Sequence, residues 1–142
     1  MSIYVDSSFV VSLYLSDRHS TEARQRIMSA PPLWFTPFHY CEWMHSIGQH
    51  VFRGEISLSE AQRMSARMEE HRSSGRWIQV AMPENTFERC ADLAGRYASK
   101  LSIRTLDSLH VACALELKAE RFWTFHERQA KLAKAEGLKT NG

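Results

Sequence analysis

The sequence lacks several features that would set it apart from ordinary soluble proteins. None of its apolar runs approaches the roughly 20 residues that a membrane-spanning helix needs, and no repeat, low-complexity segment or long linker interrupts it. The N-terminus, MSIYVDSSFVVSLYL, has no basic leader and carries Asp6 within its apolar stretch, so we expect no secretory signal and a cytoplasmic location. The 142 residues, 44% of them hydrophobic and 24% charged, predict one soluble domain over 1–142 with no membrane contact.

Motifs for common cofactors are also missing. There is no glycine-rich phosphate loop, and Ser8 stands two residues after Asp6, where haloacid-dehalogenase phosphatases have a second aspartate. The few cysteines, Cys41, Cys90 and Cys113, are odd in number and lie far apart among apolar helical neighbours, which favours reduced core thiols. The histidines near the middle of the chain are not spaced to share one helical face, so we expect no zinc site.

Short apolar runs alternate with longer helical patterns, which is typical of an α/β fold. The expected strands are 2–5, 33–36, 76–80, 121–124 and 138–140. The expected helices are 8–15, 19–29, 38–53, 57–74, 84–100, 105–118 and 126–136. Because helices separate the strands, the strands should be parallel and covered on both faces. We therefore expect a central, mainly parallel sheet of about four to five strands flanked by helices.

The paired helices in the middle of the chain have readable apolar stripes. The stripe of the first helix recurs every third or fourth residue, at Tyr40, Met44, Ile47 and Val51. The stripe of the second helix is thinner and consists of Leu58, Ala61, Met64 and Met68. Packing of the second helix against the first is one explanation of the thin stripe. The alternative is that a partner protein covers the methionines of this stripe.

Acidic residues stand where a parallel sheet forms its sites, beyond the carboxyl ends of the strands. Asp6 follows the first strand, although an aspartate there is also a favoured helix N-cap that contributes about 1 kcal/mol. Asp107 lies in the first turn of the 105–118 helix, where an acid complements the helix dipole. That helix is apolar on nearly every side, and Asp107 shares a face with His110. A carboxylate in such surroundings needs a compensating partner, and a bound cation would supply it.

Two further polar positions have competing interpretations. Glu42 lies about 200° round its helix from the apolar stripe and should face solvent, but Phe38 and Cys41 put apolar groups on that side. A position in a crevice is the alternative for Glu42. His126 follows the 121–124 strand just as Asp6 follows the first strand, so its side chain either lines the same site or caps the last helix.

The order Asp6, Glu42, Asp107 and then a polar residue after a strand resembles the PIN-domain ribonucleases over nearly the whole chain. LDSLHVACALEL is the most specific segment. IYVDSSFVVSLYL is similar to the family's first strand and acid, and FWTFHERQAKLAKAEGL to its last strand and helix, except that the family most often has Asp where this chain has His126. The small size and the GEIS link between the paired helices resemble the VapC toxins of bacterial toxin–antitoxin pairs.

The resemblance implies a three-layer PIN-like fold and a metal-dependent endoribonuclease that is the toxin of a type II toxin–antitoxin pair. Asp6, Glu42 and Asp107 would be catalytic and would hold one or two Mg²⁺ or Mn²⁺ ions, because hard cations take oxygen ligands. His126 would be a further ligand, better suited to Mn²⁺ than to Mg²⁺. The products would carry a 5′-phosphate and a 3′-hydroxyl.

The same resemblance suggests supporting residues and partners. Ser8 and Thr124 are candidate supporting hydroxyls, and Lys100 and Arg104 are weaker candidates for contacts with RNA phosphates. RNA, a cognate antitoxin and a second copy of the chain are the implied partners. Because His126 removes one negative charge from the site, the alternative is a PIN scaffold that binds RNA or a protein without cutting. The RNA target and the number of metal ions are not encoded in any motif.

Overall fold

The computed structural model describes residues 1–140, which form seven helices and five parallel strands. These residues divide into two compact units. One unit joins residues 1–6 to the segment that begins at Met82, and the other consists of residues 7–81. No helix within residues 1–140 is long and apolar enough to span a membrane. A single domain over 1–142 stays a prediction, and its last two residues lie outside the described part of the chain.

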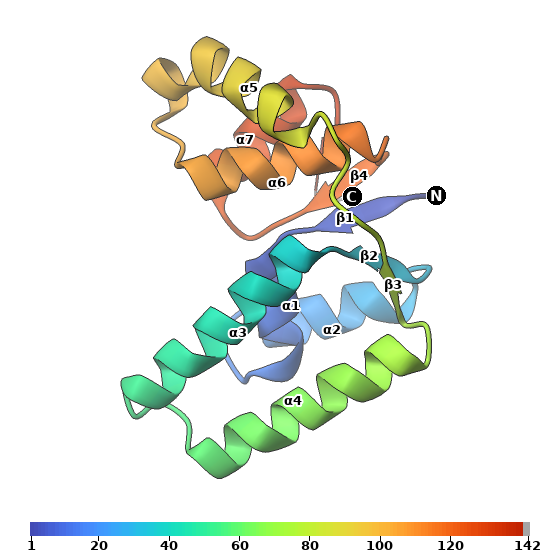
Figure 1. The fold of residues 1–142 in the computed structure, drawn as a ribbon, viewed down its shortest axis with the longest axis vertical. Helices are drawn as coiled ribbons and strands as arrows, with labels where there is room; N and C mark the ends of the chain where they lie inside the picture. The colour runs from blue at the N-terminus through green and yellow to red at the C-terminus, as the bar shows by residue number, and fades with distance from the viewer. Residues whose placement is uncertain (141–142) are drawn as a thin grey trace. The chain divides into compact units, whose positions relative to one another are not determined.

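The first unit is built round a three-stranded parallel sheet of order β1-β4-β5. Its elements are β1 (Ile3–Val5), α5 (Thr86–Leu101), α6 (Thr105–Glu116), β4 (Arg121–Trp123), α7 (Glu127–Ala135) and β5 (Lys139–Thr140). Figure 1 shows β1 beside β4, with α6 and α7 next to them. Helix α6 packs against α5 and α7, and α7 also contacts β4 and β5.

The core of this unit is continuous from strand to helix. All three residues of β1 are buried, and Tyr4 stacks on its register partner Phe122 with ring centroids 5.5 Å apart. Helix α6 is buried without a break from Ser108 to Ala114. This run confirms that the 105–118 segment is covered on nearly every side. Gly137 ends α7 with a φ of 91°, as predicted for a left-handed helix cap.

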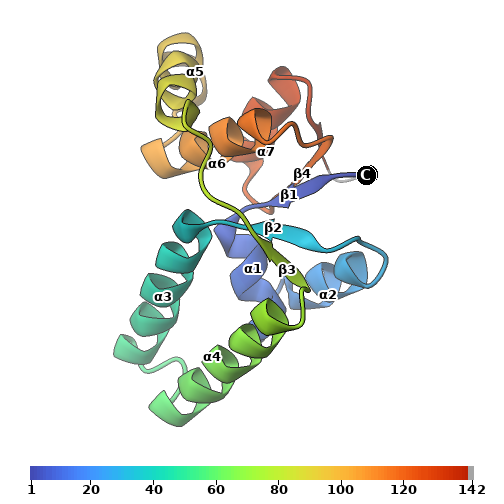
Figure 2. The same ribbon diagram turned by 45° about the vertical axis from the view of Figure 1, so that its right-hand side comes forward.

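The second unit contains α1 (Ser7–Tyr14), α2 (Ser20–Met28), β2 (Leu33–Phe35), α3 (Pro37–Phe52), α4 (Leu58–Ser73) and β3 (Trp77–Gln79). Strands β2 and β3 pair in parallel, and α1 packs against α2 and α3. Figure 2 shows α3 and α4 as an antiparallel helical hairpin. All five predicted strands are therefore present and parallel, but they are hydrogen-bonded as a set of three and a set of two rather than as one continuous sheet.

Both long helices of this unit begin with a capping box. Ser57 accepts a hydrogen bond from the Glu60 amide of α4, and the Glu60 carboxylate accepts one from the Ser57 amide. At the start of α3, Thr36 Oγ1 accepts from the His39 amide, while His39 Nδ1 accepts from the Thr36 amide. These reciprocal bonds satisfy amides that a helix N-terminus otherwise leaves unpaired.

The predicted apolar stripe of α3 is right at Ile47, which is buried, but wrong at Tyr40 and Met44. The buried residues are His39, Trp43 and Ile47, whereas Tyr40 is 37% exposed and Met44 is 50% exposed. Trp43 buries the largest apolar surface of the helix, and the His39 ring can lie beside it because its polar Nδ1 is occupied in the capping box. Because Ile47 belongs to both faces, the buried face is rotated by less than one residue from the expected one, toward His39 and Trp43.

Two other expectations about the core need correction. In α4, Met68 is 1% exposed and Ala61 is 6% exposed, so both pack within the chain, whereas Met64 is half-buried and Leu58 is 63% exposed. Cys90 and Cys113 are buried free thiols as predicted, but Cys41 is exposed. Cys41 precedes Glu42 on the side of α3 that points away from the His39 and Trp43 face.

Candidate active site

Asp6 stands at the junction of β1 and α1. Its amide donates a hydrogen bond to the Trp123 carbonyl at 3.2 Å, which extends the β1–β4 pairing by one residue before α1 begins at Ser7. The side chain is only 2% exposed although it is acidic. A carboxylate buried to this degree is costly unless polar groups or a cation compensate its charge.

Thr124 supplies one of those compensating groups. Its Oγ1 donates to Asp6 Oδ2 at 3.0 Å and accepts from the His126 amide at 3.0 Å. Thr124 is 4% exposed, so both hydrogen bonds are shielded from water. One hydroxyl therefore joins the carboxyl ends of two neighbouring strands to the start of α7. The hydrogen bond to Asp6 is a direct contact of the kind that the predicted supporting role of Thr124 requires.

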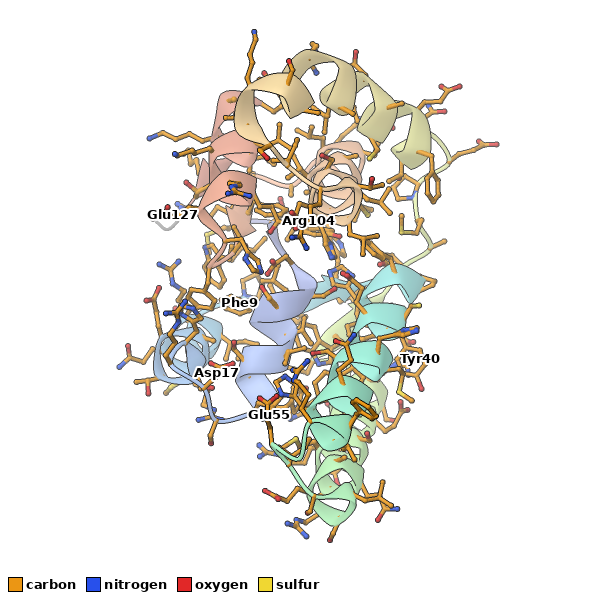
Figure 3. The ribbon with its side chains drawn as sticks, turned by 90° about the vertical axis from the view of Figure 1, so that its left-hand side faces the viewer. Phe9, Asp17, Tyr40, Glu55, Arg104 and Glu127 are labelled. Carbon is orange, nitrogen blue, oxygen red and sulfur yellow. The ribbon has the colours of Figure 1, made fainter. Side chains whose placement is uncertain are left out.

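His126 occupies the N-cap position of α7 but does not act as a cap through its side chain. The imidazole is exposed, and only the backbone amide takes part in the hydrogen bond with Thr124. His126 is thus the N-cap residue of α7 by its backbone alone, and both alternatives, a ligand of the metal site or a residue that merely caps the helix, stay predictions. Figure 3 shows Glu127, the first residue of α7, on the outside of this unit.

Asp107 lies half-buried in the first turn of α6 and is tied to α7. The Gln129 side chain donates from Nε2 to the Asp107 carbonyl at 3.2 Å, and Gln129 itself is 1% exposed. This contact was not expected from the sequence. The available signal was the position of Gln129 in α7, where it shares the buried face with Leu132 and Ala133. A polar residue on an apolar helix face is held there by a specific partner.

His110 shares the inward face of α6 with Asp107 and is a core residue rather than a metal ligand. Its Nδ1 is 2.7 Å from the Tyr4 hydroxyl, and it is 3% exposed. Nearby, burial raises the pKa of the Cys113 thiol to about 11. The layer beneath Asp107 is thus a buried, hydrogen-bonded core, as expected for a helix that is covered on this side.

Glu42 and Ser8 belong to the unit of residues 7–81. Both are half-buried, Ser8 in the first turn of α1 and Glu42 in the second turn of α3. Glu42 is half-buried, so it does not face open solvent as expected. The alternative, a position in a crevice, stays a prediction.

The cationic candidates are both exposed. Lys100 lies in the last turn of α5, and Arg104 is the residue before α6, where its side chain makes no capping hydrogen bond. Figure 3 shows Arg104 at this helix start. Their contacts with RNA stay predictions.

The chemistry of the carboxylates fits a hard divalent cation. Asp6, Asp107 and Glu42 offer oxygen donors, which suit Mg²⁺ and Mn²⁺ better than zinc. Within residues 1–140, however, no three side chains of His, Cys, Asp or Glu are grouped so that they could hold a metal ion. Asp6 and Asp107 lie in one compact unit and Glu42 in the other, and the complete ligand set stays a prediction.

Comparison with known proteins identifies the class to which this fold belongs. A model of the PIN domain matches residues 3–135, so the chain belongs to the PIN-domain family. This match confirms the resemblance inferred from the sequence and covers both compact units. A comparison with curated proteins gave no match.

Several solved structures are similar to this chain over nearly its whole length. VapC20 of Mycobacterium tuberculosis, a toxin that cleaves the sarcin–ricin loop, is 18% identical, with a TM-score of 0.70 and 96% of each chain covered. FitAcB of Neisseria gonorrhoeae is 12% identical, with a TM-score of 0.71 over 99% of this chain and 96% of that one. VapBC2 of Rickettsia felis, bound to a promoter DNA fragment, is 10% identical, with a TM-score of 0.68 over 99% and 98%. These similarities show a shared fold.

Proposed function

We propose that the chain is a metal-dependent endoribonuclease and the toxin of a type II toxin–antitoxin pair. One observation carries the proposal: the buried Asp6 carboxylate at the end of β1 is held by Thr124 from the end of β4, in the same unit as Asp107. Membership of the PIN-domain family and the fold shared with VapC20 support a nuclease acting on RNA.

In this proposal Asp6 and Asp107 bind Mg²⁺ or Mn²⁺ together with Glu42, and His126 is a further candidate ligand. When bound, the cation supplies Lewis-acid stabilisation of the phosphodiester and lowers the pKa of an attacking water. Thr124 fixes one oxygen of Asp6 by its hydrogen bond. Gln129 holds the Asp107 backbone against α7 and so fixes the position from which the Asp107 side chain extends.

The exposed imidazole of His126 favours a second candidate, a PIN scaffold that binds RNA or a protein without cutting. The two candidates differ in one measurement. Total RNA is incubated with the purified chain, with Mg²⁺, with Mn²⁺ or with a chelator, and the RNA ends are mapped. The nuclease yields discrete cuts with 5′-phosphates only when metal is present, whereas a scaffold leaves the RNA intact in all three conditions.

A cognate antitoxin and a second copy of the chain are the proposed protein partners. Support comes from a similar structure that is a toxin–antitoxin complex, from Klebsiella pneumoniae, with a TM-score of 0.59 and 17% identity. Co-expression with the product of the adjacent gene should yield a stable complex in which ribonuclease activity is lost. A free, active toxin in that preparation would contradict the pairing.

A further inference from the structure

A cavity of about 350 Å³ lies wholly within the unit of residues 7–81. It opens where β2 and β3 end, and its walls include Thr36, Pro37, Tyr40, Arg72 and Gln79. Its volume is within the usual range of about 300 to 1,000 Å³ for small-ligand sites. Neither the predicted metal ligands nor the supporting hydroxyls line this cavity, so the proposed catalysis does not account for it.

Arg72 is fixed in the wall of the cavity by hydrogen bonds in the plane of its guanidinium group. Nη1 donates to Glu69 Oε1 at 2.7 Å, while Nε and Nη2 donate to Gln79 Oε1 at 3.2 and 2.5 Å. A bidentate grip on phosphate uses these same donors, and forming it would break the existing bonds. The N–H donors along the edge of the Arg72 guanidinium group are therefore occupied, and its flat face is left for contact with an aromatic ring.

That flat face supports an aromatic ring at the rim of the cavity. The Arg72 Cζ lies 4.4 Å from the centroid of the Tyr40 ring, a distance typical of cation–π contact. Tyr40 remains 37% exposed, and the buried Phe35 ring meets it edge-on at 6.4 Å. Figure 3 shows Tyr40 projecting from the outer side of α3. The Tyr40 ring thus packs against Arg72 and Phe35 and keeps an exposed surface.

We propose that this cavity binds one base of a single-stranded RNA, which stacks on the Tyr40 ring. Single-stranded RNA is recognised mainly by stacking of splayed bases on aromatic rings and guanidinium planes, and both are present here. The Gln79 Oε1 already accepts from Arg72, so the side chain supplies its Nε2 donor at the wall for a base edge. The choice of RNA as ligand rests on the proposed function, but the site requires no metal.

The position of Tyr40 determines which nucleotide the cavity takes. Tyr40 and Glu42 are two residues apart in α3 and so point about 200° apart round a helix that is about 10 to 12 Å wide. A base on Tyr40 would therefore lie on the opposite side of α3 from Glu42, so it belongs to a nucleotide other than the one that Glu42 is proposed to help cut. The cavity would contribute to target choice rather than to the chemical step.

The test measures RNA affinity in the absence of cleavage. The full chain is titrated into a short, mixed-sequence, fluorescein-labelled single-stranded RNA in chelator, and Kd is read by anisotropy at two salt concentrations. Tyr40→Leu should raise Kd roughly tenfold, since base–aromatic stacking contributes about 1 to 3 kcal/mol. Tyr40→Phe keeps the ring and should bind as the wild type does. The salt dependence should not change, because tyrosine carries no charge.

Phe52→Leu is the matched control, because Phe52 lies on the same helix, is 90% exposed and is outside the cavity. An unchanged Kd for Tyr40→Leu, or an equal loss for Phe52→Leu, overturns the base site. A change from dimer to monomer in light scattering with RNA affinity intact also overturns it, because the face then serves a second copy. Cleavage is assayed separately with metal. A protein that binds through Tyr40 but never cuts RNA keeps the base site and refutes only the proposed nuclease.

Discussion

Replacing Thr124 by valine tests how the buried carboxylate at the end of β1 is stabilised. The substitution keeps the shape of the side chain but removes the hydroxyl that donates to Asp6 Oδ2 and accepts from the His126 amide. A hydrogen bond to a charged acceptor contributes about 1.5 to 3 kcal/mol, and Asp6 has little water to replace it because it is 2% exposed. His126 is exposed, so water can serve its amide at small cost.

We therefore expect Thr124→Val to lower the free energy of unfolding by about 2 kcal/mol. For a chain of this length the loss corresponds to a decrease in Tm of about 6 °C. Urea and thermal unfolding followed by circular dichroism measure both quantities. Thr124→Ser is the control, since it keeps the hydroxyl and loses only a methyl group, with a cost of about 1 kcal/mol.

A double-mutant cycle with Asp6→Asn isolates the contact. The penalty of Thr124→Val should fall to about half in the Asp6→Asn background, because the remaining acceptor is neutral. An unfolding midpoint of Thr124→Val equal to that of the wild type would refute the reasoning. So would a penalty that is the same with Asp6 and with Asn at that position.

Further predictions concern the fold and the metal. Gly137→Ala should destabilise the chain by about 1 kcal/mol, because Gly137 has a φ of 91°. Gly48→Ala inside α3 should instead stabilise the chain by about 0.5 to 1 kcal/mol. Equal effects of the two substitutions in urea unfolding would contradict this. The pKa of His71 is lowered, mainly by burial and then by two nearby arginines. The unfolded chain therefore takes up a proton more readily than the folded chain does. The free energy of unfolding should decrease as pH falls through about 6.5. His71→Gln should flatten that pH profile, and an unchanged slope would exclude His71. If His126 is a ligand, cleavage should prefer Mn²⁺ to Mg²⁺, and His126→Asp should raise the rate of Mg²⁺-supported cleavage. An unchanged metal preference in His126→Ala would show that His126 is not a ligand.

Local sequence patterns predicted the order of the elements because each strand and helix is bounded by recognisable signals. Pro31 and Pro32 separate α2 from β2, Ser57 caps α4 and Gly137 ends α7. Such signals act within a few residues, so they can be read without knowledge of the fold. They do not specify how strands join into sheets, and the division of the five strands into three and two was accordingly missed.

The orientation of α3 could not be read locally. The pattern of apolar residues favoured a face containing Tyr40 and Met44, but burial of the Trp43 side chain decided the outcome. His39 joins that buried face only because its ring completes a capping box, a role usually filled by Glu or Gln. The error carried over to Glu42, which was expected in solvent and is half-buried.

The acids of the candidate site could be proposed from the sequence, whereas the hydrogen bonds that hold them in place could not. Asp6 and Asp107 stand out because acids at the edge of apolar segments need compensation. The hydrogen bonds from Thr124 and Gln129 join residues far apart in sequence, 118 and 22 positions from their partners, and no local pattern encodes them. Thr124 was a weak candidate from its position alone, and Gln129 was not identified.

The most direct test of the proposed chemistry compares the two aspartates with an acid elsewhere in the same unit. Asp6→Asn, Asp107→Asn and the control Asp92→Asn, an exposed acid of α5, are incubated with total RNA and Mg²⁺ or Mn²⁺, and folding of each is verified by thermal unfolding. We predict that both site variants fold but lose cleavage by more than about 100-fold, because loss of a ligand exceeds the 10- to 100-fold effect of its supporting groups. Asp92→Asn should cut as the wild type does. Wild-type cleavage by folded Asp6→Asn or Asp107→Asn would contradict the account.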